Sequence, residues 1–147
     1  MFSKDITLAE LEEVEGSPRN STNEEDGLTK WYNKIRQKRL SELSDGDIAR
    51  AIRQKIFLTH TVPEAIRRLM INPVLGDLYD GEVMTALAEI DEDFWISDSR
   101  RSEAKPLIEL IKSGNFLTSD YQWTFEDDEE NFYKAMRQLE ARLGAER

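Results

Sequence analysis

The sequence predicts an all-α protein, a compact single-domain bundle of about six to seven short helices. Apolar residues recur at helical spacing in one segment after another, whereas the alternation expected of strands is weak and confined to residues 116–125. Capping side chains precede most of the helical segments, and Gly or Pro follows several of them. A chain of 147 residues is also long enough to bury a substantial core.

The N-terminal part of the chain reads as an acidic arm, residues 1–27, in front of a helical domain, residues 28–147. Thr7 and Glu10 have the spacing of a capping box and predict a short helix over residues 7–13. Residues 16–27 are polar and rich in helix breakers, which is typical of a linker. We therefore expect the arm to be loosely held and flexible.

The strongest helical signal lies in residues 44–57. Ser44 and Asp47 form a second capping box, and Ile48, Ile52 and Ile56 fall on one face. A weaker stripe over residues 28–35 precedes it.

Four further helices follow along the chain. A capping box predicts that the first begins at Thr61, the second is entered at residues 80–82, and the last begins at Thr124-Phe-Glu-Asp127. Pro73 ends the first of these helices and Gly114 ends the third. The expected core draws on every stripe: Leu28, Ile48, Ile52, Ile66, Leu87, Ile111 and Leu139.

Composition limits the classes of partner. Acids outnumber bases by 30 to 20, and a formal net charge of −10 disfavours direct binding of nucleic acid and favours a basic partner. The chain has no cysteine, no apolar run long enough to span a membrane and no signal-peptide pattern at its start. We therefore expect a cytoplasmic protein that acts away from membranes.

No catalytic constellation is visible, and we predict no catalytic residue, no metal ligand and no cofactor. His60 is the only histidine, and neither a nucleophile elbow nor a phosphate-binding loop occurs. Carboxylates cluster at Asp91-Glu92-Asp93 and at Glu126–Glu130, but without the spacing of a metal site. A small metal-dependent hydrolase and a helical adaptor remain the alternatives.

Four pieces of the chain carry a family resemblance, and they occur in this order: Ser41-Glu-Leu-Ser-Asp-Gly-Asp-Ile-Ala-Arg-Ala-Ile-Arg-Gln54, Pro63 with Ala65-Ile66 and Leu69, Asn72-Pro73-Val-Leu-Gly-Asp-Leu-Tyr-Asp-Gly-Glu82, and Phe94-Trp95. Through them the stretch from Trp31 to Trp95 resembles immunity proteins of bacterial contact-dependent growth inhibition (CDI) systems.

The resemblance implies a cytoplasmic inhibitor. Such a protein binds the cognate C-terminal toxin domain of a surface-displayed exoprotein, often a nuclease, and blocks its active site or the approach of its substrate. We expect a one-to-one complex, and an acidic inhibitor complements the basic surface that a nuclease needs. The motif residues themselves read as capping and core residues, with Arg50 and Arg53 expected to pair with Asp77 or Asp80.

The candidate toxin-binding residues follow the helix that is entered at residues 80–82. Acids at the C-terminal end of a helix are disfavoured by its dipole, and residues 71–98 hold 8 acids but no Lys or Arg to offset them. We therefore predict that these acids serve a partner, with the tryptophan as an aromatic anchor. The predicted surface consists of Glu89, Asp91, Glu92, Asp93, Trp95 and Asp98.

Overall fold

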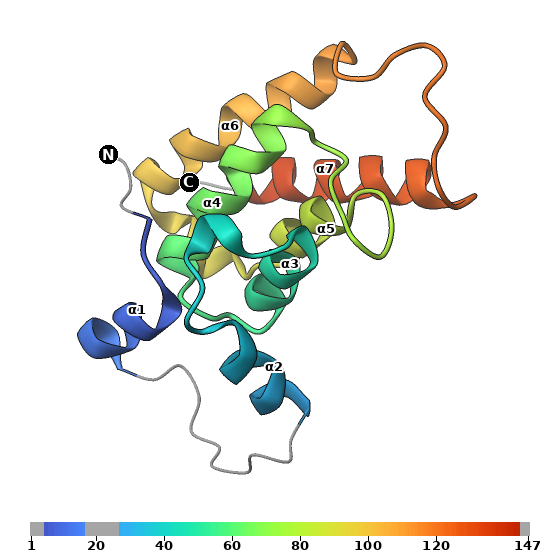
Figure 1. Ribbon diagram of the computed structural model, residues 1–147. Helices are drawn as coiled ribbons and strands as arrows, with labels where there is room; N and C mark the ends of the chain where they lie inside the picture. Colours follow the sequence, from blue (N-terminus) through green and yellow to red (C-terminus); the bar gives the residue numbers. More distant parts are fainter. Residues whose placement is uncertain (1–4, 17–26, 145–147) are drawn as a thin grey trace. The chain divides into compact units, whose positions relative to one another are not determined.

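The computed structural model describes residues 5–16 and 27–144 (Figure 1). It confirms the all-α prediction, because the described residues form seven α-helices and two 3₁₀ helices and contain no β-strand. In chain order these are α1 (Leu8–Glu15), α2 (Gly27–Ile35), η1 (Leu40–Glu42), α3 (Asp45–Arg53), α4 (Leu58–Ile71), α5 (Glu82–Ala88), η2 (Glu92–Ile96), α6 (Asp98–Ser113) and α7 (Asp128–Gly144).

The chain divides into two compact units, residues 1–44 and residues 45–147. In the first unit, Thr7 caps α1 and forms the predicted capping box with Glu10. Short backbone hydrogen bonds tie this helix to the segment after α2, from Ala9 N to Arg36 O at 2.9 Å and from Leu40 N to Ile6 O at 3.0 Å. Within this unit, the segment after α2 therefore holds α1 at its second residue, Ala9, and at Ile6, just before its N-cap.

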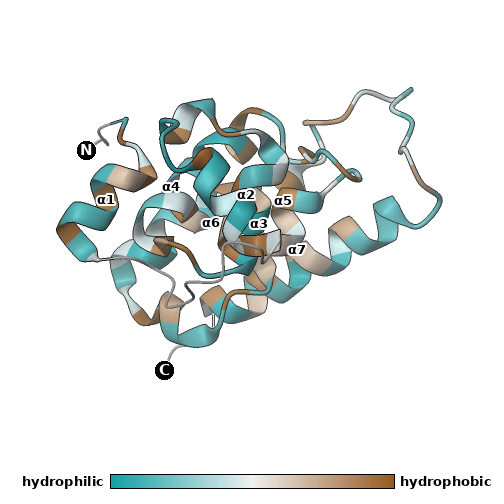
Figure 2. Ribbon diagram, turned by 60° about the horizontal axis from the view of Figure 1, so that its bottom comes forward, coloured by the Kyte–Doolittle hydropathy of each residue, from teal (hydrophilic) through white to brown (hydrophobic). Residues whose placement is uncertain are grey.

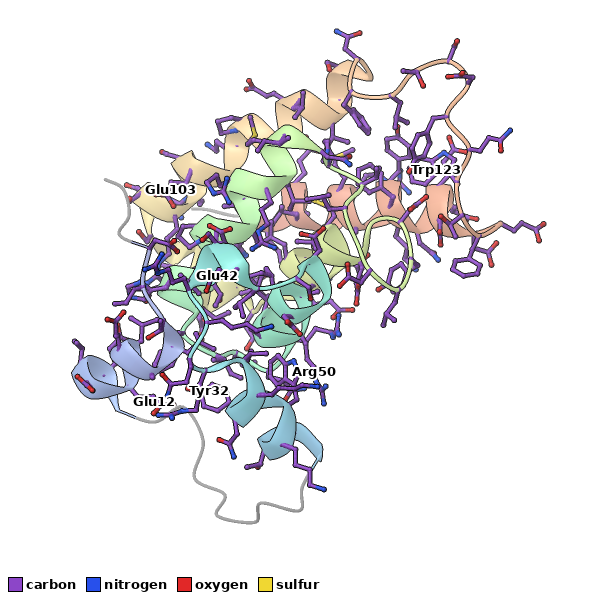
Figure 3. The ribbon with its side chains drawn as sticks, in the orientation of Figure 1. Glu12, Tyr32, Glu42, Arg50, Glu103 and Trp123 are labelled. Atoms are coloured by element: carbon purple, nitrogen blue, oxygen red, sulfur yellow. The ribbon has the colours of Figure 1, made fainter. Side chains whose placement is uncertain are left out.

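Glu12 is the polar centre of the first unit. It accepts hydrogen bonds from the Tyr32 hydroxyl and from both ends of the Arg36 guanidinium (Figure 3). The hydrogen bonds from Arg36 lower the pKa of Glu12, and burial together with Glu12 raises the pKa of Tyr32. The expected flexibility of an arm over residues 1–27 stays a prediction, since residues 1–4 and 17–26 lie outside the described part.

The second unit is built around α5, a short helix that is buried on almost every side. It packs against α3, α4 and α7, and α6 packs against α4 and α7. All but one of its residues are buried: Glu82, Val83, Met84, Ala86, Leu87 and Ala88. The longer helices around it are amphipathic, as the alternation of hydrophilic and hydrophobic residues along α7 illustrates (Figure 2).

Most of the predicted core is confirmed. Ile48, Ile52, Ile66, Leu87, Ile111 and Leu139 are all buried. Leu28 is the exception, because it lies half-buried in the first turn of α2, while Tyr32 and Ile35 supply the buried face of that helix.

The predicted helix over residues 44–57 is shorter than expected. It begins at Asp45 but ends at Arg53, where Lys55 turns the chain with a φ of 59°. Lys55 N donates to Ile52 O and Ile56 N donates to Ala51 O, both at 2.9 Å, which is the Schellman pattern that usually ends on glycine. A lysine in this left-handed conformation costs about 1–2 kcal/mol, and burial of Ile56 offsets that cost.

The next helix begins earlier than predicted, at Leu58 and not at the Thr61 capping box. Phe57 precedes it with a φ of 45°, and its carbonyl accepts from His60 N and Thr61 N. Thr61 is fully buried, and its hydroxyl donates back to the carbonyl of Ile56 at 3.1 Å. The threonine is therefore used inside the helix, and the predicted cap is wrong.

The last helix begins later than predicted, at Asp128 and not at Thr124. Thr124 donates to Asp80 through its backbone N–H at 3.0 Å and through its hydroxyl at 3.2 Å. Phe125 lies before the helix and is 56% exposed. The predicted start at Thr124 is wrong, because the distant carboxylate of Asp80 binds Thr124.

Glu82 organises the turn that leads into α5. It is 1% exposed, and its Oε1 accepts the backbone N–H groups of Asp77 at 2.9 Å and Leu78 at 3.1 Å. Its Oε2 lies 3.5 Å from Arg53 Nη1 on α3. Arg53 therefore pairs with Glu82 and not with the predicted Asp77 or Asp80.

The Ser41–Gln54 and Asn72–Glu82 pieces of the family motif contact each other. Gly46 N donates to Asp77 Oδ2 at 2.8 Å, and a Cβ on Gly46 would lie only 2.7 Å from that oxygen. Gly81 has a φ of +88°, which favours glycine, and lies against Phe132 of α7. These residues join α3, α5 and α7.

We expect Ile52→Ala to lower the free energy of unfolding by about 2–5 kcal/mol, because it leaves a cavity in the contact between α3 and α5. Urea titration followed by circular dichroism at 222 nm measures this loss. A loss below about 1 kcal/mol would contradict the position of α3 in the core.

We expect Glu82→Ala to destabilise the fold by about 2–5 kcal/mol, because it removes the buried carboxylate that accepts from the N–H groups of Asp77 and Leu78 and that pairs with Arg53. Glu82→Gln keeps an amide oxygen for the two N–H groups and should cost clearly less. The same urea titration compares the two variants. Equal losses would mean that the N–H groups of Asp77 and Leu78 do not depend on Glu82.

Candidate functional site

The predicted acidic residues lie on one continuous stretch of the second unit. Glu89 caps the C-terminal end of α5, Asp91 precedes η2, and Asp98 is the first residue of α6. Glu92 and Asp93 lie in η2 itself. All five acidic side chains are exposed, so the structure places them on the surface as a group.

Cations from other parts of the chain offset some of this charge. Lys55 Nζ lies 3.0 Å from Asp91 Oδ2, and Arg101 pairs with Asp98. Arg142 of α7 donates to the carbonyl of Ile90 at 2.8 Å, just beyond the end of α5. Residues 71–98 themselves supply no cation, but Lys55 and Arg101 from outside this stretch offset Asp91 and Asp98.

Two arginines of α6 hold η2 in place. Arg101 Nη1 donates to the carbonyls of Trp95 at 2.8 Å and Ile96 at 2.7 Å. Arg100 donates to the carbonyl of Phe94 at 3.2 Å, and its guanidinium lies 4.1 Å from the centre of the Phe94 ring. The exposed acids of η2 thus lie on a backbone that hydrogen bonds from α6 hold in place.

Three of the acids have no such cation. Glu89, Glu92 and Asp93 make no side-chain hydrogen bond or ion pair with the residues that the structure describes. Carboxylates that lie close together and lack a counter-charge give a surface a negative potential, which attracts a basic partner.

Trp95 does not belong to the exposed surface that we predicted for it. Its side chain is 1% exposed and packs edge-on against Phe94, with the ring centres 4.9 Å apart. Its indole N–H has no acceptor among the described residues. The exposed apolar side chain of this turn is Ile96, at 69% exposure, which the sequence analysis missed.

The segment from Glu89 to Asp98, which carries the predicted acids, is called the acidic turn below. A groove of about 290 Å³ opens beside it. It is bounded by the end of α3, the start of α4 and the segment from α5 to η2. Its lining consists of Ile52, Arg53, Lys55, Leu58, Ala86, Glu89, Ile90, Asp91, Asp93 and Phe94. Sequence reasoning could not find this groove, because the segments that form it are distant along the chain.

The second acidic cluster, Glu126–Glu130, lies at the N-terminal end of α7, whereas Arg142 lies near its C-terminal end. Asp128 is buried and accepts from Asp80 N at 3.3 Å and Phe125 N at 3.1 Å, so it has a structural role. Glu126, Asp127, Glu129 and Glu130 are exposed. Because Asp128 and Arg142 are separated by about 21 Å of helix, the two acidic surfaces are well apart.

The loop between α6 and α7 carries this second cluster away from the bundle (Figure 1). Asp80 accepts from the Tyr121 hydroxyl at 3.0 Å, and burial together with Asp80 raises the pKa of Tyr121 to about 12. Trp123 lies over α7, against Phe132 and Tyr133 (Figure 3). The motif residue Asp80 therefore positions the loop.

The described residues contain no group of three or more His, Cys, Asp and Glu side chains that could hold a metal ion. Among those same residues, no helix combines the length and the apolar character that crossing a bilayer requires. His60 is half-buried in the first turn of α4.

Comparison with known proteins identifies a family. A family model described as CDI immunity proteins matches residues 13–104, which is well over half of the chain and contains α3, α5 and the acidic turn. No curated protein matches the chain. The matched stretch includes the Ser41–Gln54 and Asn72–Glu82 pieces and the contact between Gly46 and Asp77. The chain belongs to the family of CDI immunity proteins.

Proposed function

We propose that this protein neutralises the cognate toxin domain of a CDI exoprotein by binding it one to one in the cytoplasm. The toxin is a basic domain, a nuclease, and the complex blocks its active site or the approach of its substrate. The immunity protein contributes no catalysis and no cofactor. Family membership supports the immunity role, and the acidic surface supports a basic partner.

The binding surface in this proposal consists of Glu89, Asp91, Glu92, Asp93 and Asp98. The observation that carries it is the group of three exposed carboxylates, Glu89, Glu92 and Asp93, which pair with no cation among residues 5–16 and 27–144. They lie on a turn whose backbone Arg100 and Arg101 hold by hydrogen bonds. A rigid surface loses little conformational entropy on binding. Trp95 supports this turn from the core and does not itself contact the toxin.

We expect inhibition of the toxin to saturate at one equivalent of immunity protein. The test uses the toxin domain encoded next to this protein, its nuclease activity and the mass of the complex in solution. The isolated immunity protein should release no product from DNA or RNA, with or without EDTA. Turnover that EDTA abolishes would favour a metal-dependent hydrolase, and a complex that leaves the toxin active would favour an adaptor.

We expect the triple reversal Asp91→Lys, Glu92→Lys and Asp93→Lys to leave the helical content unchanged and to slow toxin association by at least tenfold at low salt. The dependence of the association rate on salt should flatten as well. Stopped-flow mixing at several salt concentrations measures both effects.

The matched control is Glu126→Lys, Asp127→Lys and Glu129→Lys, which makes the same change in net charge on the other acidic surface. Equal slowing by the two variants would mean that only overall charge matters. A larger effect of the control variant would move the binding surface to the loop before α7. Unfolding of the first variant, with unchanged affinity per folded molecule, would make its acids structural.

A further inference from the structure

We propose that the groove beside the acidic turn receives one basic side chain of the toxin, and that Lys55 occupies its rim in the free protein as an internal substitute for that side chain. This inference rests on the proposed function and specifies where the partner binds. It adds a contact that the acidic surface alone does not define, namely a recess with an apolar floor and a charged rim.

The lining of the groove matches a lysine or arginine in both of its parts. Ile52, Ala86 and Ile90 are buried and form an apolar floor, which suits the methylene stem of such a side chain. Glu89 and Asp93 stand exposed on the rim, where they suit the cationic head. A volume of about 290 Å³ lies at the lower limit for ligand pockets, which fits a single side chain.

The charges of the groove favour a cation over an anion. Arg53 lies 3.5 Å from the buried carboxylate of Glu82, which neutralises it. The remaining rim charges are three carboxylates and the ammonium of Lys55. The groove is therefore short of positive charge, and a basic residue of the partner supplies it.

Lys55 is bound loosely enough to be displaced. Its ammonium lies 3.0 Å from Asp91, but the two side chains are 67% and 68% exposed, and exposed pairs contribute little to stability. The turn at Lys55 favours glycine by its backbone geometry, so the fold does not need a lysine there. Its side chain partly neutralises the rim until a partner's cation replaces it at Asp91.

The test compares Lys55→Ala with Lys112→Ala. Both variants remove one lysine that pairs with an acid, because Lys112 pairs with Glu140 on the outside of α6 and α7. If Lys55 competes with the toxin, Lys55→Ala should lower the Kd for the toxin domain about three- to tenfold, and Lys112→Ala should change it less than twofold. Isothermal titration calorimetry measures these constants, and urea titration of each variant verifies its fold.

Replacement of the rim acids should act in the opposite direction. Glu89→Gln and Asp93→Asn should each raise the Kd about tenfold, whereas Glu109→Gln, on the exposed face of α6, should leave it within twofold. Alanine substitutions of the Lys and Arg residues of the toxin then identify the inserted side chain. With that residue removed, the gain from Lys55→Ala should disappear.

The outcomes separate this inference from the proposed function. Tight inhibitory binding with a Kd that Lys55→Ala, Glu89→Gln and Asp93→Asn leave unchanged would overturn the groove contact and leave the immunity function standing. Weaker binding of Lys55→Ala would mean that Lys55 itself contacts an acidic group of the toxin, which also overturns the inference. Absence of any complex with the wild-type protein would overturn both.

Discussion

The buried carboxylate of Glu82 is the interaction on which the second unit depends. It closes the turn before α5 through the N–H groups of Asp77 and Leu78, and it faces Arg53 of α3. A buried carboxylate is costly unless its oxygens are bound, so the turn and the helices must form together. Because α5 packs against α3, α4 and α7, the position of one side chain fixes the arrangement of four helices.

This dependence gives the family motif a structural meaning. Gly46 approaches Asp77 closely, Gly81 lies against Phe132, and Asp80 holds the loop before α7 through Tyr121 and Thr124. Gly46, Asp77, Asp80 and Gly81 are thus engaged in contacts within the protein. Recognition in our proposal therefore belongs to the neighbouring acidic turn, whose position the motif sets through α5.

The sequence predicted the ends of a helix correctly where the capping residue acts on the helix next to it in the chain. Thr7 caps α1 and Gly114 ends α6, as predicted. The predictions failed where a distant group takes over: Asp80 binds Thr124 from 44 residues away, and Arg142 reaches Ile90 across 52 residues. The positions of the acids were readable from the sequence, but the burial of Trp95 and the groove depend on tertiary packing.

The same kind of long-range contact allows the fold to keep the negative charge of the acidic turn. Arginines of α6 and α7 satisfy the carbonyls of Ile90, Phe94 and Trp95, so the backbone of the turn is stabilised without neutralising its side chains. Cations of α6 and α7 thus bind carbonyls of η2 and of Ile90, which lies just beyond the negative end of the α5 dipole. The fold can therefore keep Glu89, Glu92 and Asp93 exposed and unpaired within the described part of the chain, which is the charge distribution that attracts a basic partner.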